Sequence, residues 1–243
     1  MIIDVHAHLD FLPEEKLIEI QSNPHISLVI TNSVNVESNK KNLELATKYP
    51  KIKYAVGLYP EDNLIQENIE ELKQLIGKNK EKVMAVGEIG LDKTENLDFE
   101  NQINFFKQQL EIAKQLNVPA IIHTRKAEKE VIDILEELNY PKIILHCFSG
   151  NFKLVKRAID LGYYFSIPTN VVRAEHFQKM LTLVPHNQIL TETDTPYLSP
   201  FKEKQNEPGF ILESIKKMSE IWKIPEKEVE NQIEKNFKNL FKI

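Results

Sequence analysis

Eight short apolar stretches recur along the chain, and each is followed by a loop and a segment with helical periodicity. The stretches are rich in β-branched residues, and several are apolar throughout, which is typical of parallel strands covered on both faces. Strands that alternate with helices every 25–30 residues or so, roughly the length of one βαβ repeat, predict parallel β/α units. The eight stretches are residues 2–5, 27–31, 53–57, 83–89, 118–122, 142–145, 163–167 and 188–191.

Helical periodicity is clearest in three of the other segments. Within residues 98–116, apolar side chains recur every three or four residues and define one face, and residues 127–138 and 225–241 show the same pattern. The last segment opens with Pro225, and proline suits the first turn of a helix. These segments predict helices that pack on the strands.

The number of units and the chain length favour one α/β architecture. Eight β/α units in 243 residues match a (β/α)8 TIM barrel, which typically has about 250 residues. We therefore predict a single domain that spans residues 1–243. A doubly wound open sheet is the alternative. The position of polar residues separates the two folds, because a barrel gathers the carboxyl ends of all its strands at one mouth.

Polar residues follow the predicted strands at their carboxyl ends, as the barrel requires. His6 and His8 are two positions apart, so they project to the same side of an extended strand. Imidazoles and carboxylates bind transition metals, and six such groups are more than one tetrahedral ion needs. They predict two ions with one bridging carboxylate, which together activate water for displacement at phosphorus. The other four groups are Glu88, His123, His146 and Asp194.

Composition argues against several classes of protein. The formal net charge is -5, whereas a protein that coats polyanions carries a basic surplus. Cys147 is the only cysteine, so no intrachain disulfide forms. No apolar run approaches the roughly 18 residues of a membrane span, and the amino-terminal sequence lacks the features of a signal peptide. We expect a cytoplasmic enzyme with no membrane contact and no obligate protein partner.

Five motifs occur in an order that resembles a known family. They are DVHAHLD from Asp4, GEIGLD around Glu88, IIHTR around His123, LHCFSG around His146 and TETDTPYL around Asp194. Together with NEP at 206–208 and NFKNLF near the end, they resemble the TatD-type metal-dependent DNases of the amidohydrolase superfamily. The resemblance covers essentially the whole chain, and the five motifs in order are far more specific than any one of them.

The resemblance implies a role for each of the six groups. It assigns Glu88 to both metals and makes Asp194 a metal ligand. Because a carboxylate in this position can take a proton from water, we also expect Asp194 to accept the proton of the attacking water. Members are described as Mg2+-, Mn2+- or Zn2+-dependent nucleases, several with 3′–5′ exonuclease activity, which implies single-stranded DNA or DNA ends as the substrate. By position, His6, His8 and Asp194 match ligands of one ion, and His123 and His146 match ligands of the second.

Further residues near these motifs have expected roles. Where this chain has Tyr59, the family usually has a histidine that faces the substrate near the metals. We therefore expect Tyr59 to face the substrate and donate a hydrogen bond, although a phenol is a poorer proton shuttle near neutral pH because its pKa is about 10. Arg125 follows His123 by two positions and is expected either to bind a phosphate oxygen or to pair with a carboxylate. Asp4 and Asp92 are candidates to orient the histidines.

The same scaffold serves other hydrolases, since fold does not fix function. A phosphotriesterase, lactonase, esterase, amidase or aminoacyl-tRNA deacylase is the alternative to a deoxyribonuclease, and a non-catalytic scaffold is disfavoured because all six groups are present. The acidic net charge leaves these hydrolases as alternatives, because the chain has no overall basic surplus for binding DNA. Binding of DNA then requires local basic residues, for which Lys51, Lys53, Lys93, Lys202 and Lys204 are candidates.

Overall fold

Eight parallel strands pair in chain order in the computed structural model, which describes residues 1–60, 64–94 and 98–242. All eight predicted strands are present, with bounds that differ by a few residues. The strand predicted to end at residue 89 continues to Asp92. The strands are β1 (Ile2–Ala7), β2 (Ile26–Asn32), β3 (Ile52–Val56), β4 (Val83–Asp92), β5 (Ala120–Arg125), β6 (Ile143–His146), β7 (Tyr164–Pro168) and β8 (Ile189–Glu192).

The last strand lies beside the first, so the strands form a nearly closed barrel rather than an open sheet. The Thr191 hydroxyl donates to the carbonyl of Ile3 at 2.6 Å. Beyond β8, the Asp194 N–H donates to the carbonyl of His6 at 2.8 Å. The architecture is therefore the predicted (β/α)8 barrel.

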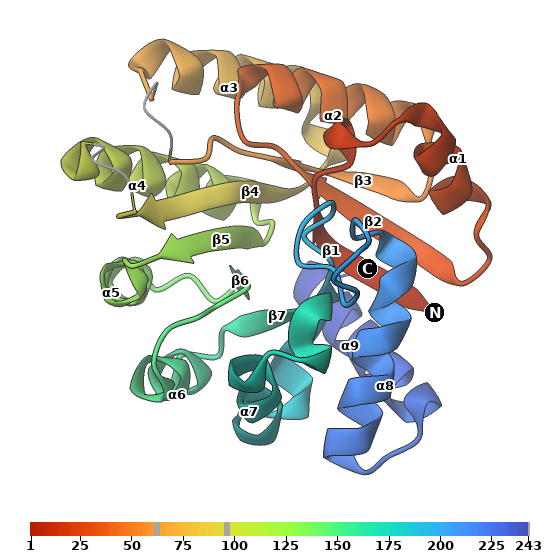
Figure 1. The fold of residues 1–243 in the computed structure, drawn as a ribbon. Coiled ribbons are helices and arrows are strands. Elements are labelled where there is room, and N and C mark those ends of the chain that lie inside the picture. The colour runs from red at the N-terminus through yellow and green to blue at the C-terminus, as the bar shows by residue number, and fades with distance from the viewer. Residues whose placement is uncertain (61–63, 95–97, 243) are drawn as a thin grey trace.

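Helices surround the strands on the outside of the barrel (Figure 1). The helix predicted for residues 98–116 begins at Phe99 in the structure. Asp98 caps it, because its carboxylate accepts the N–H of Asn101. The helices are α1 (Glu14–Ser22), α2 (Val36–Lys48), α3 (Gln66–Asn79), α4 (Phe99–Leu116), α5 (Glu128–Leu138), α6 (Phe152–Asp160), α7 (Glu175–Leu183), α8 (Ile211–Trp222) and α9 (Glu226–Phe241). Short 3-10 helices are η1 (Leu9–Phe11), η2 (Lys80–Lys82), η3 (Thr169–Val172), η4 (His186–Gln188) and η5 (Pro208–Phe210).

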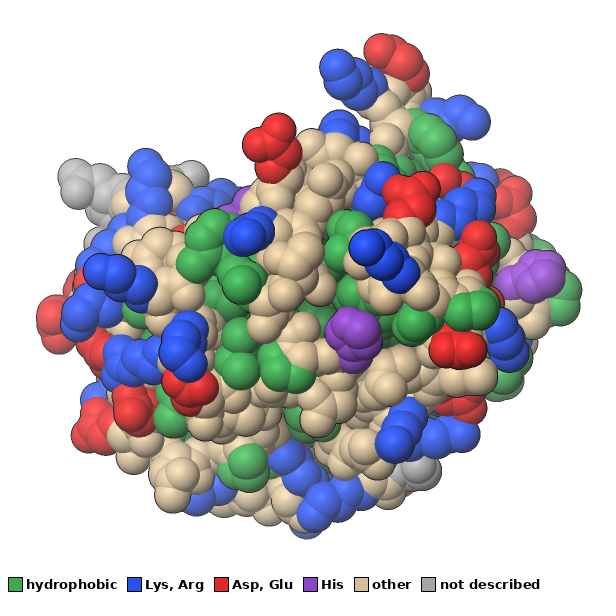
Figure 2. Space-filling view, turned by 90° about the horizontal axis from the view of Figure 1, so that it is seen from below, with side chains coloured by type: hydrophobic (Ala, Val, Ile, Leu, Met, Phe, Trp, Pro, Cys, Tyr) green, Lys and Arg blue, Asp and Glu red, His purple; other side chains and the backbone are tan. Residues whose placement is uncertain are grey.

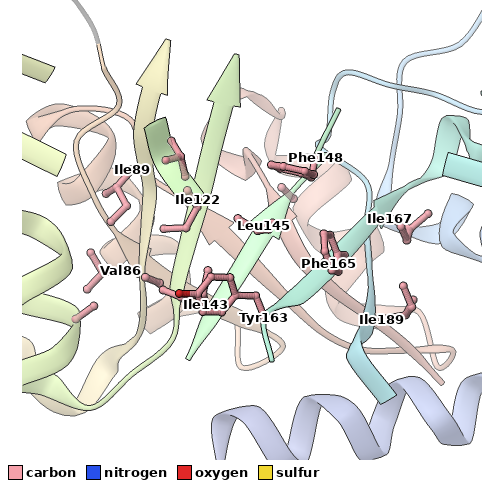
Figure 3. Packing of buried hydrophobic residues seen from close by; sticks show 14 of the residues in the cluster. Val86, Ile89, Ile122, Ile143, Leu145, Phe148, Tyr163, Phe165, Ile167 and Ile189 are labelled. Carbon is pink, nitrogen blue, oxygen red and sulfur yellow. The ribbon is translucent and has the colours of Figure 1, made fainter. Parts of the chain in front are cut away.

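Apolar side chains form two layers, one inside the barrel and one between the strands and the helices. The inner layer takes alternate residues of the strands, among them Val5 of β1 and Ile121 of β5, and Phe237 of α9 packs against it. The outer layer contains the intervening strand residues, such as Ile122 and Leu145 (Figure 3). Apolar burial is the main favourable contribution to folding, so these layers hold the strand ends in place.

A change of register in β1 determines where its histidines point. Strict alternation from Val5 would place His6 on the outside of the barrel. The pairing of β1 with β2 shifts between Asp4 and Ala7, however. His6 is therefore fully buried on the inside, with its Nε2 3.4 Å from Glu88 Oε2.

A second change of register occurs in β4. Ala85 belongs to the inner layer, so strict alternation would turn Glu88 outward. The pairing of β4 with β5 shifts between Val86 and Ile89, and Glu88 points into the barrel. Gly87 allows the close packing at this point, since a Cβ there would lie 2.7 Å from the Cβ of Ile121.

The helical surface carries charges of both signs. On the face in Figure 2, basic and acidic side chains are interspersed, with apolar side chains between them. Exposed pairs three or four residues apart include Lys216 with Glu213 in α8 and Lys238 with Glu234 in α9. Among the described residues, no helix is long and apolar enough to cross a membrane.

Candidate metal centre

The six predicted metal-binding side chains meet at the carboxyl ends of the strands. They come from five different strand ends, and five of the six residues are buried, Asp194 being the partly exposed one. Above them lies a cavity of about 280 Å3, whose rim includes Phe11, Arg125 and Tyr197. The six are His6 in β1, His8 just after it, Glu88 in β4, His123 in β5, His146 in β6 and Asp194 just after β8.

Glu88 lies between two groups of imidazoles. Its Oε2 is 3.4 Å from His6 Nε2 and 3.3 Å from His8 Nε2. Its Oε1 is 2.9 Å from His123 Nδ1 and 3.9 Å from His146 Nε2. Each carboxylate oxygen therefore faces a separate set of nitrogen donors.

The spacing within each set suits a metal ion. Asp194 Oδ1 lies 3.5 Å from His6 Nε2 and 3.4 Å from His8 Nε2. Atoms that bind one tetrahedral ion at about 2.1 Å are about 3.4 Å from each other. The described residues thus contain a first donor set of His6, His8 and Asp194 and a second of Glu88, His123 and His146.

His6 gives an independent sign that the site takes a cation. Both of its ring nitrogens are buried and lack a hydrogen-bond partner within the described part of the chain, although buried polar atoms are almost always satisfied. Burial by itself raises the pKa of Glu88, but the neighbouring His6 and His123 hold it well below its usual range. An ionised carboxylate beside unsatisfied imidazole nitrogens is the chemistry of a divalent-cation site.

Glu192 supports the second donor set through the ring nitrogen of His146 that does not face Glu88. Its Oε2 is 2.8 Å from His146 Nδ1, and its Oε1 accepts the N–H of Cys147 at 3.0 Å. The Ser166 hydroxyl also donates to it. Sequence reasoning did not single out Glu192, but the signal was available, because it lies two positions after Leu190 and therefore continues the inward face of β8.

Asp92 supports the other histidine of this set, as predicted. Its Oδ2 is 3.2 Å from His123 Nε2 and accepts the Tyr59 hydroxyl at 3.0 Å. Arg125 Nη1 lies 3.6 Å from the same oxygen, with its side chain 58% exposed at the cavity rim. Burial and the charges of Glu88 and Asp92 raise the pKa of Tyr59, so its phenol stays a neutral hydrogen-bond donor.

Asp4 acts differently from the prediction. Within the described residues it hydrogen-bonds to no imidazole ring, and it accepts the main-chain N–H of His6 at 3.2 Å and that of Thr193 at 3.1 Å. The Thr193 hydroxyl donates to it at 2.6 Å. Burial raises the pKa of Asp4 to about 7. Asp4 thus joins the ends of β1 and β8, which carry His6 and Asp194.

Two of the lysines expected to offset the acidic charge lie at the wrong end of the barrel. Lys51 precedes β3 and Lys53 is the second residue of that strand, so both are at the amino end, opposite the cavity. Lys93 follows the carboxyl end of β4, and Lys202 and Lys204 lie in the segment that follows β8. Of the five lysines, only these three remain candidates. The sequence could not separate them from Lys51 and Lys53, because loops at the two ends of a barrel look alike in sequence.

Comparisons with known proteins agree with the fold and with a metal-dependent hydrolase. The model of a family described as TatD related DNase matches residues 3–242. An uncharacterized metal-dependent hydrolase of Methanocaldococcus jannaschii is 32% identical, covering 99% of this chain and 96% of its own. The human protein named deoxyribonuclease TATDN3 is 28% identical, with 99% and 94% covered. The crystal structure of the Escherichia coli TatD homolog YJJV is 27% identical, with a TM-score of 0.91 and coverage of 100% and 98%.

A (β/α)8 barrel whose strand ends hold histidine and carboxylate clusters suited to metal defines a metal-dependent hydrolase. The chain belongs to the TatD related DNase family, because the family match extends over nearly its full length.

Proposed function

We propose that this protein is a deoxyribonuclease of the 3′–5′ exonuclease type, acting on single-stranded DNA or DNA ends. The observation that carries the proposal is the position of Glu88, whose two oxygens face two donor sets at 2.9–3.9 Å. Such a carboxylate suits a pair of cations, which is the arrangement used for displacement at phosphorus. The relation to a human protein named a deoxyribonuclease supports DNA as the substrate.

The chain's own residues would hold two divalent cations, either Mg2+, Mn2+ or Zn2+. When bound, the pair supplies Lewis acidity and a water of lowered pKa. Glu88 fixes the separation of the two sites, and Glu192 and Asp92 fix the rings of the second set. The proposed ligands are His6, His8, Asp194 and Glu88 for one cation and Glu88, His123 and His146 for the other.

Asp194 accepts the proton of the attacking water in this proposal. Its side chain is 15% exposed and lines the cavity, whereas that of Glu88 is 5% exposed. Burial favours the neutral acid, but the imidazoles of His6 and His8, each with its Nε2 within 3.5 Å of Oδ1, hold the pKa of Asp194 well below its usual range. The carboxylate is therefore ionised when it meets the water, as a general base must be.

Arg125 and Tyr59 position the phosphodiester. The Arg125 guanidinium is exposed at the rim, and among the described residues it pairs with Asp92 through Nη1 at 3.6 Å. A guanidinium has five N–H donors, so it can also bind a phosphate oxygen. Tyr59 directs a neutral hydroxyl toward the second donor set. When substrate binds, the hydrogen bond that Tyr59 donates to Asp92 shifts to the phosphate or its leaving oxygen, and the phenol keeps its proton.

The test is a substrate panel on purified protein loaded with Mn2+. We expect single-stranded DNA labelled at its 5′ end to yield a ladder that shortens from the 3′ end. Asp194→Asn should lower kcat by about 10²–10⁴-fold, the usual contribution of a general base. Glu220→Gln, at an exposed position of α8, is the matched control and should leave kcat unchanged.

The same panel contains RNA, a phosphotriester, a lactone and an aminoacyl-tRNA. Turnover of one of these with no cleavage of DNA would replace the proposed function by another hydrolase on the same scaffold. DNA cleavage that persists unchanged in Asp194→Asn would instead contradict the mechanism.

A further inference from the structure

Two exposed aromatic side chains stand beside the candidate metal centre. Phe11 is 54% exposed and Tyr197 is 55% exposed, and both line the cavity above Glu88. Their ring centroids lie 5.9 Å and 6.4 Å from that of His8. Phe11 follows β1 and Tyr197 follows β8. Together these two residues, called here the aromatic wall, form one side of the cavity mouth.

The residues before Phe11 are buried and hydrogen-bonded, although its own ring is exposed. It ends the 3-10 helix η1, in which Leu9 and Asp10 are buried. The Leu9 N–H donates to Thr31 Oγ1 at 3.1 Å, and the Lys41 ammonium donates to the carbonyl of Asp10. The flanking residues thus fix the turn and leave only the phenyl ring outside it.

Tyr197 is fixed in a similar way. Its N–H donates to the carbonyl of Asp194 at 2.7 Å, and the carbonyl of the preceding Pro196 accepts the Asn206 N–H at 3.0 Å. Leu198, the next residue, accepts the Thr169 hydroxyl at 3.0 Å. The main chain of Tyr197 is therefore hydrogen-bonded directly to a proposed metal ligand, and its ring lines the cavity.

Exposed aromatic rings in a polar, metal-binding cavity suit a ligand with a flat face on which they can stack. Phe11 and Tyr197 line one cavity and are therefore not apolar residues scattered singly over the surface. Aromatic rings stack on every nucleobase regardless of sequence. Across the cavity, the exposed Arg125 offers a cation to a phosphate. A flat base on one side and an anionic phosphate on the other is the chemistry of a nucleotide.

We propose that the aromatic wall stacks on the nucleobase next to the scissile phosphodiester of a single-stranded end. This inference rests on the proposed function and adds the residues that select the substrate. A base inside a duplex is paired and stacked between its neighbours, so its face is not available to the wall. The wall therefore selects unpaired ends, and a base-free chain loses the contact.

The experiment compares two oligodeoxynucleotides of equal length, one with bases throughout and one with abasic tetrahydrofuran residues at its 3′ end. Phe11→Ala and Tyr197→Ala should each raise KM for the first by about tenfold, within the range measured for one stacked base. They should leave KM for the abasic chain unchanged. Phe11→Trp and Tyr197→Phe keep a ring and should retain the wild-type KM.

The matched control is Phe152→Ala, which removes a ring that is 40% exposed in α6 but does not line the cavity. It should behave as the wild type on both chains. A second readout uses an oligonucleotide with 2-aminopurine at its 3′ end and a phosphorothioate linkage that slows cleavage. Binding to the Mn2+-loaded wild type should quench its fluorescence, and binding to the two alanine variants should not.

The outcomes separate this inference from the proposed function. Stacking by the aromatic wall is wrong if the wild type cleaves DNA and the alanine variants keep its KM. It is also wrong if their KM rises equally on the abasic chain and on the chain with bases. If the wild type cleaves no DNA, the proposed function is wrong. The 2-aminopurine signal still decides stacking in that case, since unchanged fluorescence on saturation overturns it and quenching that needs both rings supports it.

Discussion

The two donor sets on either side of Glu88 are supported in different ways. In the second set, each imidazole has a carboxylate partner on its far nitrogen: Glu192 is 2.8 Å from His146 Nδ1, and Asp92 is 3.2 Å from His123 Nε2. Such partners fix the ring and raise the basicity of the nitrogen that binds metal. The second set therefore depends on side chains that are not themselves ligands.

The first set has no such carboxylates behind its rings in the described structure. His8 Nδ1 is 3.2 Å from the main-chain carbonyl of Asn32, and neither ring nitrogen of His6 has a hydrogen-bond partner. The charge of Asp194, close to both rings, takes the place of a supporting carboxylate. The difference implies that the two cation sites respond differently to substitutions outside the ligands.

The largest expected effect follows from removing what the two sets share. Glu88→Gln replaces the carboxylate that faces both sets with a neutral amide, a far weaker ligand for hard and borderline cations. We expect loss of both tight Mn2+ sites in calorimetric titration and a fall in kcat of about 10³-fold or more. Two Mn2+ sites of wild-type affinity in this variant would contradict the claim that the two donor sets share Glu88.

A smaller effect should be confined to the second set. Glu192→Gln leaves all six proposed ligands in place but weakens the partner of His146, and we expect one of two Mn2+ sites to weaken by about 10–100-fold. Ser166→Ala is the control, since it removes one bond to Glu192 and keeps its charge. Thermal melting of the cation-free variants reports any loss of folding separately. Equal weakening of both sites would show that the two sets are not independently supported.

The smallest expected effect tests the register change that turns Glu88 inward. In Gly87→Ala the new Cβ would lie 2.7 Å from the Cβ of Ile121 and 2.9 Å from Asn32 Oδ1, so we expect a loss of about 1–3 kcal/mol of unfolding free energy in urea. Gly77→Ala is the control, because its Cβ meets no atom within 4 Å in α3 and should stabilise the helix by about 0.5–1 kcal/mol. Equal stability of the two variants would contradict the tight packing at Gly87.

The strands differ in how well the sequence predicts which of their side chains point into the barrel. The eight strands and the barrel follow from the spacing of apolar stretches and from the polar residues at their ends. In β5 and β6 the alternation alone is sufficient, since Ile121 predicts an inward His123 and Ile144 predicts an inward His146. Glu192 could have been found by the same rule.

The positions of His6 and Glu88 could not be derived from alternation. Both follow register changes, one between Asp4 and Ala7 and one between Val86 and Ile89. A register change depends on the pairing with a neighbouring strand and leaves no signal in the periodicity of its own strand. The two-residue spacing did predict that His6 lies on the same side as His8, and both meet Glu88 Oε2. Glu88 was placed in the site by its chemistry and by the family resemblance.

The most direct test of the account is a crystal structure of the protein with Mn2+, with the ions located by anomalous scattering. The account predicts two peaks about 3.5–4 Å apart, one on His6, His8 and Asp194 and one on His123 and His146, with Glu88 touching both. A single ion, or ions held by other residues, would contradict it.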